Sequence, residues 1–285
     1  MSTELLAPSA GLAARRRREV YYPDGDGKPM AETNLHVSIM IQIREILRYW
    51  LRAVEMTSVY ANMLFYFREG NPTARVAPDV FVVLGVPFDV MRRSYKIWED
   101  RQAPQVIFEI TSRKTQATDL GKKRFVYARL GVSEYYLFDP FREYLDPPLR
   151  GYQLAGEEYM PMPVDVIPPP ALNGHDAANE FSQSWRLASE RLKLEIWAFA
   201  PAHAQKPCVL RFYDPAAGEW LMDPEQAMIE HDVFKRRARA AEARAANEAQ
   251  ARQSAEEHTI TEAQARKMAE ERIARLEAEL KKLRG

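Results

Sequence analysis

The 285-residue sequence contains almost no cysteine and carries no net charge. The single cysteine, Cys208, excludes an internal disulfide and a cysteine-only metal cluster, and it suits a reducing, cytoplasmic compartment. Basic and acidic residues both number 40, so the global charge does not predict attraction to nucleic acid. A local basic patch is still compatible with this balance.

Long apolar runs and several catalytic signatures are also missing. No run of about 18 apolar residues occurs, so we expect no membrane span. We find no phosphate-binding glycine loop, no Gly-x-Ser-x-Gly elbow and no paired cysteine or histidine zinc spacing. The Arg15-Arg16-Arg17-Arg18 cluster follows the mildly apolar start of the chain, whereas a secretory signal carries its charge before such a stretch. A solvated tail is the simpler interpretation of this cluster, and phosphate contact is the alternative.

The composition of the chain is sufficient for a packed core, with 46% hydrophobic and 11% aromatic residues. Shifts in composition predict four segments. Residues 1–30 form a flexible N-terminal segment, and residues 31–170 form the main domain. A β-rich extension of that domain covers 171–231, and a long helix covers 232–285.

Hydrophobic periodicity predicts an α/β fold for the main domain. A helix capped by Thr33 or Asn34 is followed by strands over 59–66, 80–84 and 105–110. The residues between the last two strands, which include Tyr95 and Trp98, are expected to form a loop that closes over something. A helix over about 118–130 and a strand over 134–140 complete a parallel crossover unit. Further strands are expected over 194–199 and 208–213.

The C-terminal segment is rich in Ala, Glu, Arg, Lys and Gln, which favours a long helix. Ile273, Leu276, Leu280 and Leu283 are spaced 3, 4 and 3 residues apart, as in a coiled-coil seam. The seam is short and alanines fill the earlier positions. Homodimerisation through this helix and a solitary helix are therefore both open.

Two carboxylates mark the candidate site. Asp79 follows Pro78 at the start of a strand, and Glu109 lies in an otherwise apolar strand, where an ionised group is costly unless it is paired or metal-bound. Carboxylates on neighbouring strands can share Mg²⁺, with Mn²⁺ as the alternative. For Asp79 the competing interpretation is an ordinary turn residue.

A positive charge should accompany these acids, and Lys114, Lys122 and Lys123 are the candidates. Lys123 follows Asp119 by four residues on one helix face, so a surface ion pair with Asp119 is the simpler interpretation before any resemblance is considered. Glu32 and His36 lie one turn apart at the start of the first helix, a spacing that suits a metal pair. The helix dipole explains Glu32 and a place at the edge of the core explains His36 just as simply.

Several stretches resemble a known family. They are Tyr22-Pro23-Asp24 through Met30-Ala31-Glu32, Arg75-Val76-Ala77-Pro78-Asp79-Val80, Pro104 through Ser112, Asp119-Leu120-Gly121-Lys122-Lys123, and Glu134 through Pro140. In this order they resemble the Uma-type restriction endonucleases of the PD-(D/E)XK nuclease superfamily, over roughly residues 20–225.

The resemblance implies a restriction-endonuclease-like core, a mixed sheet flanked by helices, and Mg²⁺-dependent hydrolysis of DNA phosphodiester bonds by metal-activated water. It assigns the metal to Asp79, Glu109 and the backbone carbonyl of Ile110, and Glu32 matches the acidic position of the first helix. The lysine expected two residues after the acid is replaced by Thr111. Related families carry this lysine on the following helix, where Lys123 matches, with Lys122 as the alternative.

Two rival interpretations stand beside the nuclease. One is a catalytically weak or inactive nuclease-like module that binds nucleic acid or assembles through its coiled coil, because fold alone does not settle function. The zero net charge favours this rival slightly. The other, a purely structural coiled-coil protein, is disfavoured because the tail is under a fifth of the chain.

Overall fold

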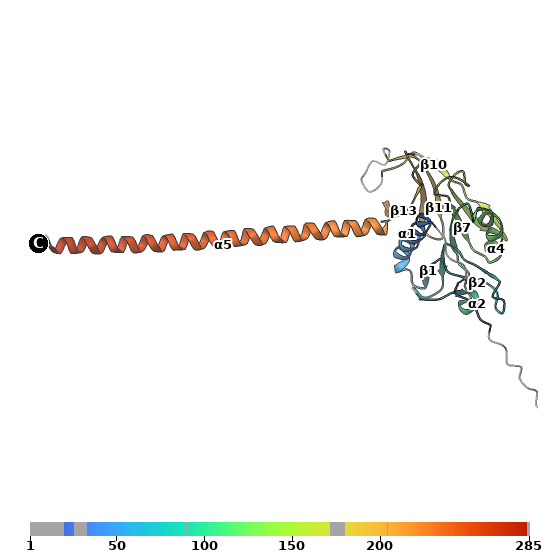
Figure 1. The fold of residues 1–285 in the computed structure, drawn as a ribbon, viewed down its shortest axis with the longest axis horizontal. Coiled ribbons are helices and arrows are strands. Elements are labelled where there is room, and N and C mark those ends of the chain that lie inside the picture. Colours follow the sequence, from blue (N-terminus) through green and yellow to red (C-terminus); the bar gives the residue numbers. More distant parts are fainter. Residues whose placement is uncertain (1–19, 26–32, 89, 172–179, 204, 284–285) are drawn as a thin grey trace, which may run out of the picture. The chain divides into compact units, whose positions relative to one another are not determined.

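The computed structural model describes residues 20–25, 33–88, 90–171, 180–203 and 205–283. The chain divides into two units, residues 1–224 and 225–285 (Figure 1). The first unit holds three sheets and the shorter helices, and the second consists of a single helix. Within the described residues, none of the helices has a stretch long and apolar enough to cross a bilayer.

The central sheet of the first unit has six strands in the order β1-β4-β6-β7-β8-β9. β6 pairs with β7 in parallel, and the other neighbours are antiparallel. This sheet is therefore mixed, and the predicted parallel crossover unit is confirmed. The strands are β1 (Thr57–Ala61), β4 (Val80–Leu84), β6 (Val106–Ile110), β7 (Glu134–Phe138), β8 (Leu149–Ala155) and β9 (Glu158–Pro161).

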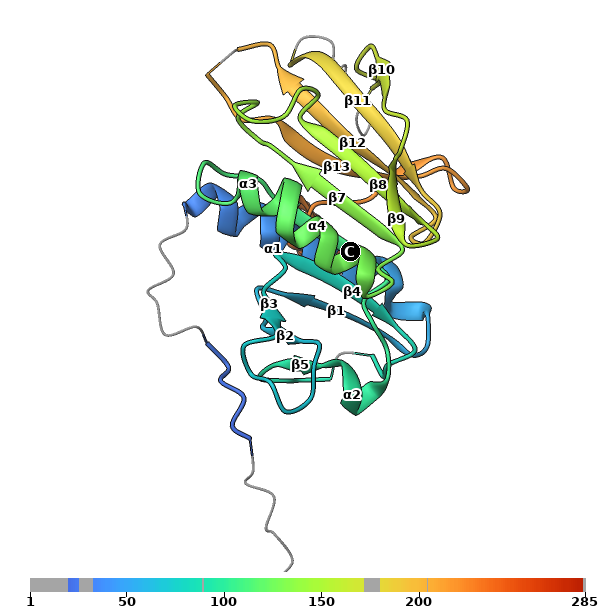
Figure 2. The ribbon, with the colours of Figure 1, turned by 90° about the vertical axis from the view of Figure 1, so that its right-hand side faces the viewer.

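One face of the central sheet packs against helix α1 (Asn34–Trp50) and a second, five-stranded sheet (Figure 2). Thr33, one of the two caps predicted from the sequence, caps α1 by accepting the His36 N–H. Ile39, Ile43 and Leu47 form part of the buried face of α1. The second sheet contains β10 (Asp165–Ile167), β11 (Phe181–Ser189), β12 (Leu194–Pro201), β13 (Val209–Asp214) and β14 (Glu219–Trp220).

The other face of the central sheet is covered by a helical segment and by a small sheet, β3-β2-β5. The helical segment is α3 (Gln116–Thr118), a π-helical turn η2 (Asp119–Lys123) and α4 (Arg124–Arg129). The small sheet consists of β2 (Phe65–Tyr66), β3 (Arg75–Val76) and β5 (Tyr95–Lys96). Short helices η1 (Leu51–Ala53) and α2 (Ile97–Asp100) complete this unit.

Three details of the expected secondary structure were wrong. The run over 59–66 is two strands in different sheets, because Asn62 has a positive φ of 48° that ends β1. The expected loop around Tyr95 contains a strand and a helix, and the Tyr95 ring is fully buried among core aromatics. The helix expected over 118–130 is interrupted by the π-helical turn η2.

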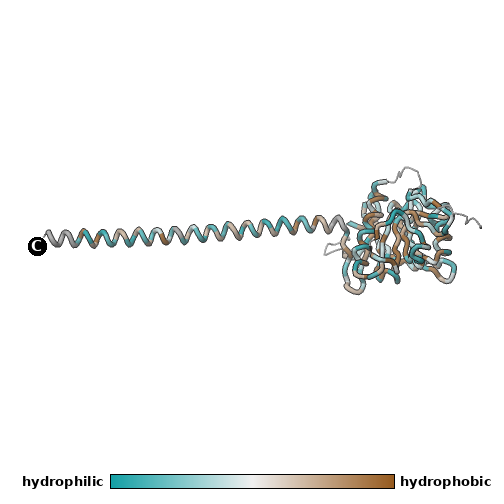
Figure 3. The backbone as a smooth tube through the Cα atoms, turned by 90° about the horizontal axis from the view of Figure 1, so that it is seen from below, coloured by the Kyte–Doolittle hydropathy of each residue, from teal (hydrophilic) through white to brown (hydrophobic). Residues whose placement is uncertain are grey.

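The C-terminal helix α5 spans Pro224–Leu283, so it begins before residue 232, where we expected it to start. Hydrophilic and hydrophobic residues are mixed along it without a long apolar stretch (Figure 3). Ile273 and Leu276 of the predicted seam are 56% and 53% exposed. Other apolar side chains of α5 are also more than half exposed: Met228, Ile229, Phe234, Ile260 and Met268.

Candidate active site

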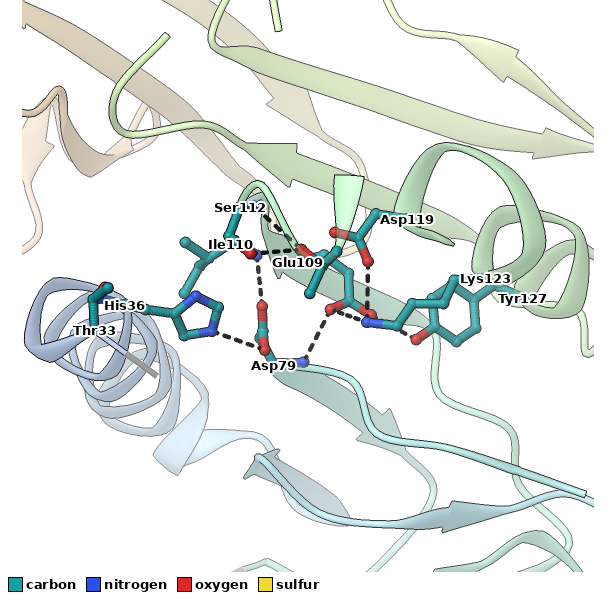
Figure 4. Close-up of polar contacts among 10 residues, drawn as sticks. Thr33, His36, Asp79, Glu109, Ile110, Ser112, Asp119, Lys123 and Tyr127 are labelled. Atoms are coloured by element: carbon teal, nitrogen blue, oxygen red, sulfur yellow. Dashed lines mark hydrogen bonds and ion pairs between the residues drawn. The ribbon is translucent and has the colours of Figure 1, made fainter. Parts of the chain in front are cut away.

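The two acidic residues singled out in the sequence lie side by side at one edge of the central sheet. Asp79 immediately precedes β4, and Val80 pairs with Phe108 of β6, so Asp79 faces Glu109 across the antiparallel pair. The Asp79 backbone N–H points at Glu109 Oε2 at 3.4 Å (Figure 4). Because side chains alternate along β6, Glu109 shares the face of Ile107 while Phe108 and Ile110 enter the opposite core.

Asp79 is held on both of its carboxylate oxygens. Oδ2 accepts the backbone N–H of Ile110 at 2.7 Å, and Oδ1 lies 3.1 Å from Nε2 of His36. His36 comes from the first turn of α1 and is buried. The helix on one face of the sheet therefore fixes the orientation of a carboxylate at the end of a strand.

Glu109 is approached from the opposite face. Its side chain is 1% exposed; Oε2 accepts a charged hydrogen bond from Lys123 Nζ at 2.8 Å, and Oε1 accepts one from the Tyr127 hydroxyl at 2.6 Å. Both donors come from the helical segment that follows β6. The buried carboxylate is thus paired and hydrogen-bonded, which is the condition under which a charge tolerates burial.

Lys123 also reaches a third carboxylate. Its Nζ lies 3.1 Å from Asp119 Oδ1, so the predicted Asp119–Lys123 pair exists. However, the pair is buried, with Lys123 15% and Asp119 1% exposed, whereas the sequence indicated a surface pair. The π-helical turn carries both residues and turns Lys123 toward the sheet. Lys122 is exposed, and none of the ion pairs among the described residues involves it.

The electrostatics of the cluster follow from burial and crowding of like charges. Burial raises the pKa of Glu109 to about 8; Lys123 opposes the rise, and Asp79 and Asp119 add to it. Burial also raises the pKa of Asp119. Burial alone would lower the pKa of Lys123, but Glu109 and Asp119 raise it above its ordinary value. Lys123 therefore stays an ammonium at all physiological pH values.

The residues fit a hard divalent cation. The cluster holds three carboxylates and one ammonium, which contacts Glu109 and Asp119. Asp79 and Asp119 add to the rise in the Glu109 pKa that burial causes. The buried hydroxyl oxygen of Thr111, two residues after Glu109, has no hydrogen-bond partner in the described structure. In the described part of the chain, no group of three or more His, Cys, Asp or Glu side chains is placed so that it could hold a metal ion. Mg²⁺ does not need three such ligands, because it keeps waters and is held through one or two carboxylates.

The structure thus brings four of the five residues predicted for the site into one place. Asp79, Glu109 and Lys123 are in contact, and Ile110 contributes its N–H to Asp79. The fifth, Glu32, lies outside the described residues. Lys114 is exposed on the loop after β6 and makes none of the ion pairs seen in the described part of the chain.

Tyr127 and Asp119 were not predicted as members of the site, and His36 was weighed lightly. One signal could have found them, since Asp119, Lys123 and Tyr127 recur at intervals of four and so share one helix face.

The part of the chain that holds the site matches a known family model. The model of the Uma2 family, described as "Putative restriction endonuclease", matches residues 10–181. This span includes every residue of the site described above. No curated protein matches the chain. A solved structure from Anabaena variabilis, described as a putative nuclease belonging to DUF820, is 18% identical with a TM-score of 0.37, covering 50% of this chain and 75% of its own.

The expected fold class, an α/β restriction-endonuclease-like core with a long C-terminal helix, is confirmed. The match covers more than half of the chain. The chain therefore belongs to the Uma2 family, whose description is "Putative restriction endonuclease".

Proposed function

We propose that this protein is a Mg²⁺-dependent endonuclease that hydrolyses phosphodiester bonds in DNA, with Mn²⁺ as an alternative ion. The observation that carries the proposal is the 2.8 Å contact between Lys123 Nζ and Glu109 Oε2 beside Asp79. Two acids and a lysine meet at one sheet edge although the lysine is absent from the position after β6, where Thr111 stands.

Asp79 and Glu109, with the Ile110 carbonyl, would hold the ion, and Glu32 is the further acid that the sequence suggests. Mg²⁺ held there supplies Lewis-acid chemistry, since it polarises a phosphodiester and lowers the pKa of water. His36 and the Ile110 N–H keep the Asp79 carboxylate in a fixed orientation. Tyr127 does the same for Glu109, so both acids are oriented before substrate arrives.

Lys123 contributes a permanent positive charge. Because its pKa lies above the ordinary value, it acts as a hydrogen-bond donor and not as a base. From its place between Glu109 and Asp119 it can orient the attacking water and stabilise the negative charge that develops on the phosphate. Asp119 limits the directions in which the ammonium can move.

The long helix supports a second part of the proposal. Ile273 and Leu276 lie three residues apart on α5 and are more than half exposed. Large apolar side chains at this spacing are buried when two helices form a coiled coil. We propose that the protein forms a homodimer through this part of α5.

The catalytic proposal is tested by nicking of supercoiled plasmid with Mg²⁺, with Mn²⁺ and with EDTA. Wild type should convert the plasmid to open circles only with metal, and Glu109→Ala should lose at least 1,000-fold in rate, about 4 kcal/mol of transition-state stabilisation. Metal-dependent nicking that survives in Glu109→Ala would refute the assignment. The rival, an inactive nucleic-acid-binding or assembly module, predicts DNA binding without nicking in wild type.

A further inference from the structure

Four exposed cations lie on the segments that border the acidic cluster. Arg113 and Lys114 follow β6, Lys122 belongs to η2, and Arg142 follows β7. We call these four residues the cationic rim. All four side chains are exposed, in contrast to the buried Lys123 beside them.

The rim and the cluster occupy the same edge of the central sheet. β6 and β7 are parallel, and Ile110 pairs with Phe138, so both strands end together. The Thr111 N–H donates to the Phe138 carbonyl and keeps the two following loops adjacent. Neighbouring strands are about 4.8 Å apart, so the two loops leave the sheet side by side at the strand ends where Glu109 lies.

Within the described structure, none of the rim residues has an ion-pair partner. Other arginines of this unit are neutralised locally, for example Arg92 by Asp100 and Arg186 by Asp165. The buried carboxylate on the second loop, Asp139, is occupied because it accepts backbone N–H groups of Phe141, Tyr144 and Leu145.

The loop after β7 also carries two exposed acids, Glu143 and Asp146, which is half the number of rim cations. Exposed cations therefore outnumber exposed acids on these two loops, although the chain as a whole has no net charge.

We infer that the cationic rim binds backbone phosphates of duplex DNA on either side of the bond that is cleaved. This inference rests on the proposed function and adds the surface that holds the substrate. Unpaired cations on separate loops match a row of regularly spaced charges, and phosphate contacts of this kind position a duplex without reading its sequence. An anionic membrane surface would also attract the rim, but it offers nothing for the adjacent acids and lysine to act on.

The test is the salt dependence of binding, measured by fluorescence anisotropy of a labelled duplex with EDTA present to prevent cleavage. The test variant carries Arg113→Gln, Lys114→Gln, Lys122→Gln and Arg142→Gln. The matched control carries Arg191→Gln and Lys193→Gln, two exposed cations in the β11–β12 turn. That turn lies at the opposite edge, since the Arg191 N–H donates to Glu134 at the start of β7.

Each phosphate contact contributes about 0.9 to the slope of log K against log salt, so loss of four contacts should flatten the slope by about 3 to 4. We expect the rim variant to bind at least 10-fold more weakly at moderate salt, with a thermal melt like that of wild type. The control should keep the wild-type affinity and slope. An unchanged slope in the rim variant, or an equal loss in the control, overturns the inference.

The inference and the proposed function fail in different ways. If wild type binds DNA through the rim but never nicks it with Mg²⁺ or Mn²⁺, the rim inference stands and the catalytic proposal fails. If wild type nicks DNA and the rim variant binds with the wild-type slope, the catalytic proposal stands and the rim inference fails. A loss of vesicle binding in the rim variant that is not matched by a loss of DNA binding points to a membrane partner and refutes the inference.

Discussion

Tyr127→Phe should destabilise the protein more at high pH than at low pH. The Tyr127 hydroxyl donates to Glu109 Oε1 at 2.6 Å, and both residues are buried. A buried hydrogen bond to a charged group contributes about 1.5–3 kcal/mol, and a neutral one about 1 kcal/mol. Because the pKa of Glu109 is raised to about 8, the carboxyl is neutral at pH 6 and charged at pH 9.5. Phenylalanine keeps the edge-on ring contact with Tyr135, so packing changes little.

We therefore expect a loss of about 1 kcal/mol in the free energy of unfolding at pH 6 and about 2–3 kcal/mol at pH 9.5. Urea denaturation of the metal-free protein, followed by tryptophan fluorescence, measures both values. Tyr135→Phe is the matched control, because its hydroxyl donates to the neutral backbone carbonyl of Asp119 at 3.0 Å. Its cost should be about 1 kcal/mol at both pH values. A Tyr127→Phe cost that is the same at both pH values, or smaller at pH 9.5, would refute the reasoning.

Three further predictions concern the pH dependence of stability, the joint between the sheets and the long helix. The folded-state pKa of Glu109, about 8, lies above its ordinary value of 4.5. The metal-free protein should therefore lose stability as the pH rises from the lower value through the higher one. Glu109→Gln should remove this pH dependence in urea melts. Glu134 is buried and accepts hydrogen bonds from the Tyr136 and Ser189 hydroxyls and from the Arg191 N–H. Glu134→Ala should therefore lower the free energy of unfolding in urea by about 3 kcal/mol, while kcat for nicking at the other sheet edge stays unchanged. An unaltered urea melt would contradict this. Ile273→Asp with Leu276→Asp should convert a dimer into a monomer in sedimentation velocity, and a wild-type monomer would refute the coiled-coil proposal.

Much of the main domain could be predicted because its strands carry distinct local patterns. The apolar run around Glu109 correctly indicated a central strand, and strand, helix and strand over 106–138 correctly indicated a parallel pair. The break after Ala61 could not be predicted, since the residues on both sides of it favour strands. The pairing of β2 with β5, some thirty residues later, depends on tertiary packing that no local pattern encodes.

The candidate site was predictable where a residue conflicts with its local surroundings. A carboxylate in an apolar strand is such a conflict, and it drew attention to Glu109. Tyr127 and Asp119 fit their helical surroundings, so nothing local indicated that they touch the acid or its lysine. His36 has its partner 43 residues away, and only the fold brings its ring to Asp79.

The most direct test of the account compares two adjacent lysines. Lys123 is buried against Glu109, whereas Lys122 is exposed and belongs to the rim. Single-turnover cleavage at saturating DNA and Mg²⁺ should fall at least 100-fold in Lys123→Met, the loss of about 3 kcal/mol expected for a buried charged contact to the transition state. Lys122→Met should stay within about threefold of wild type under these conditions. Equal rates for the two variants, or a larger loss at Lys122, would contradict the assignment of the site.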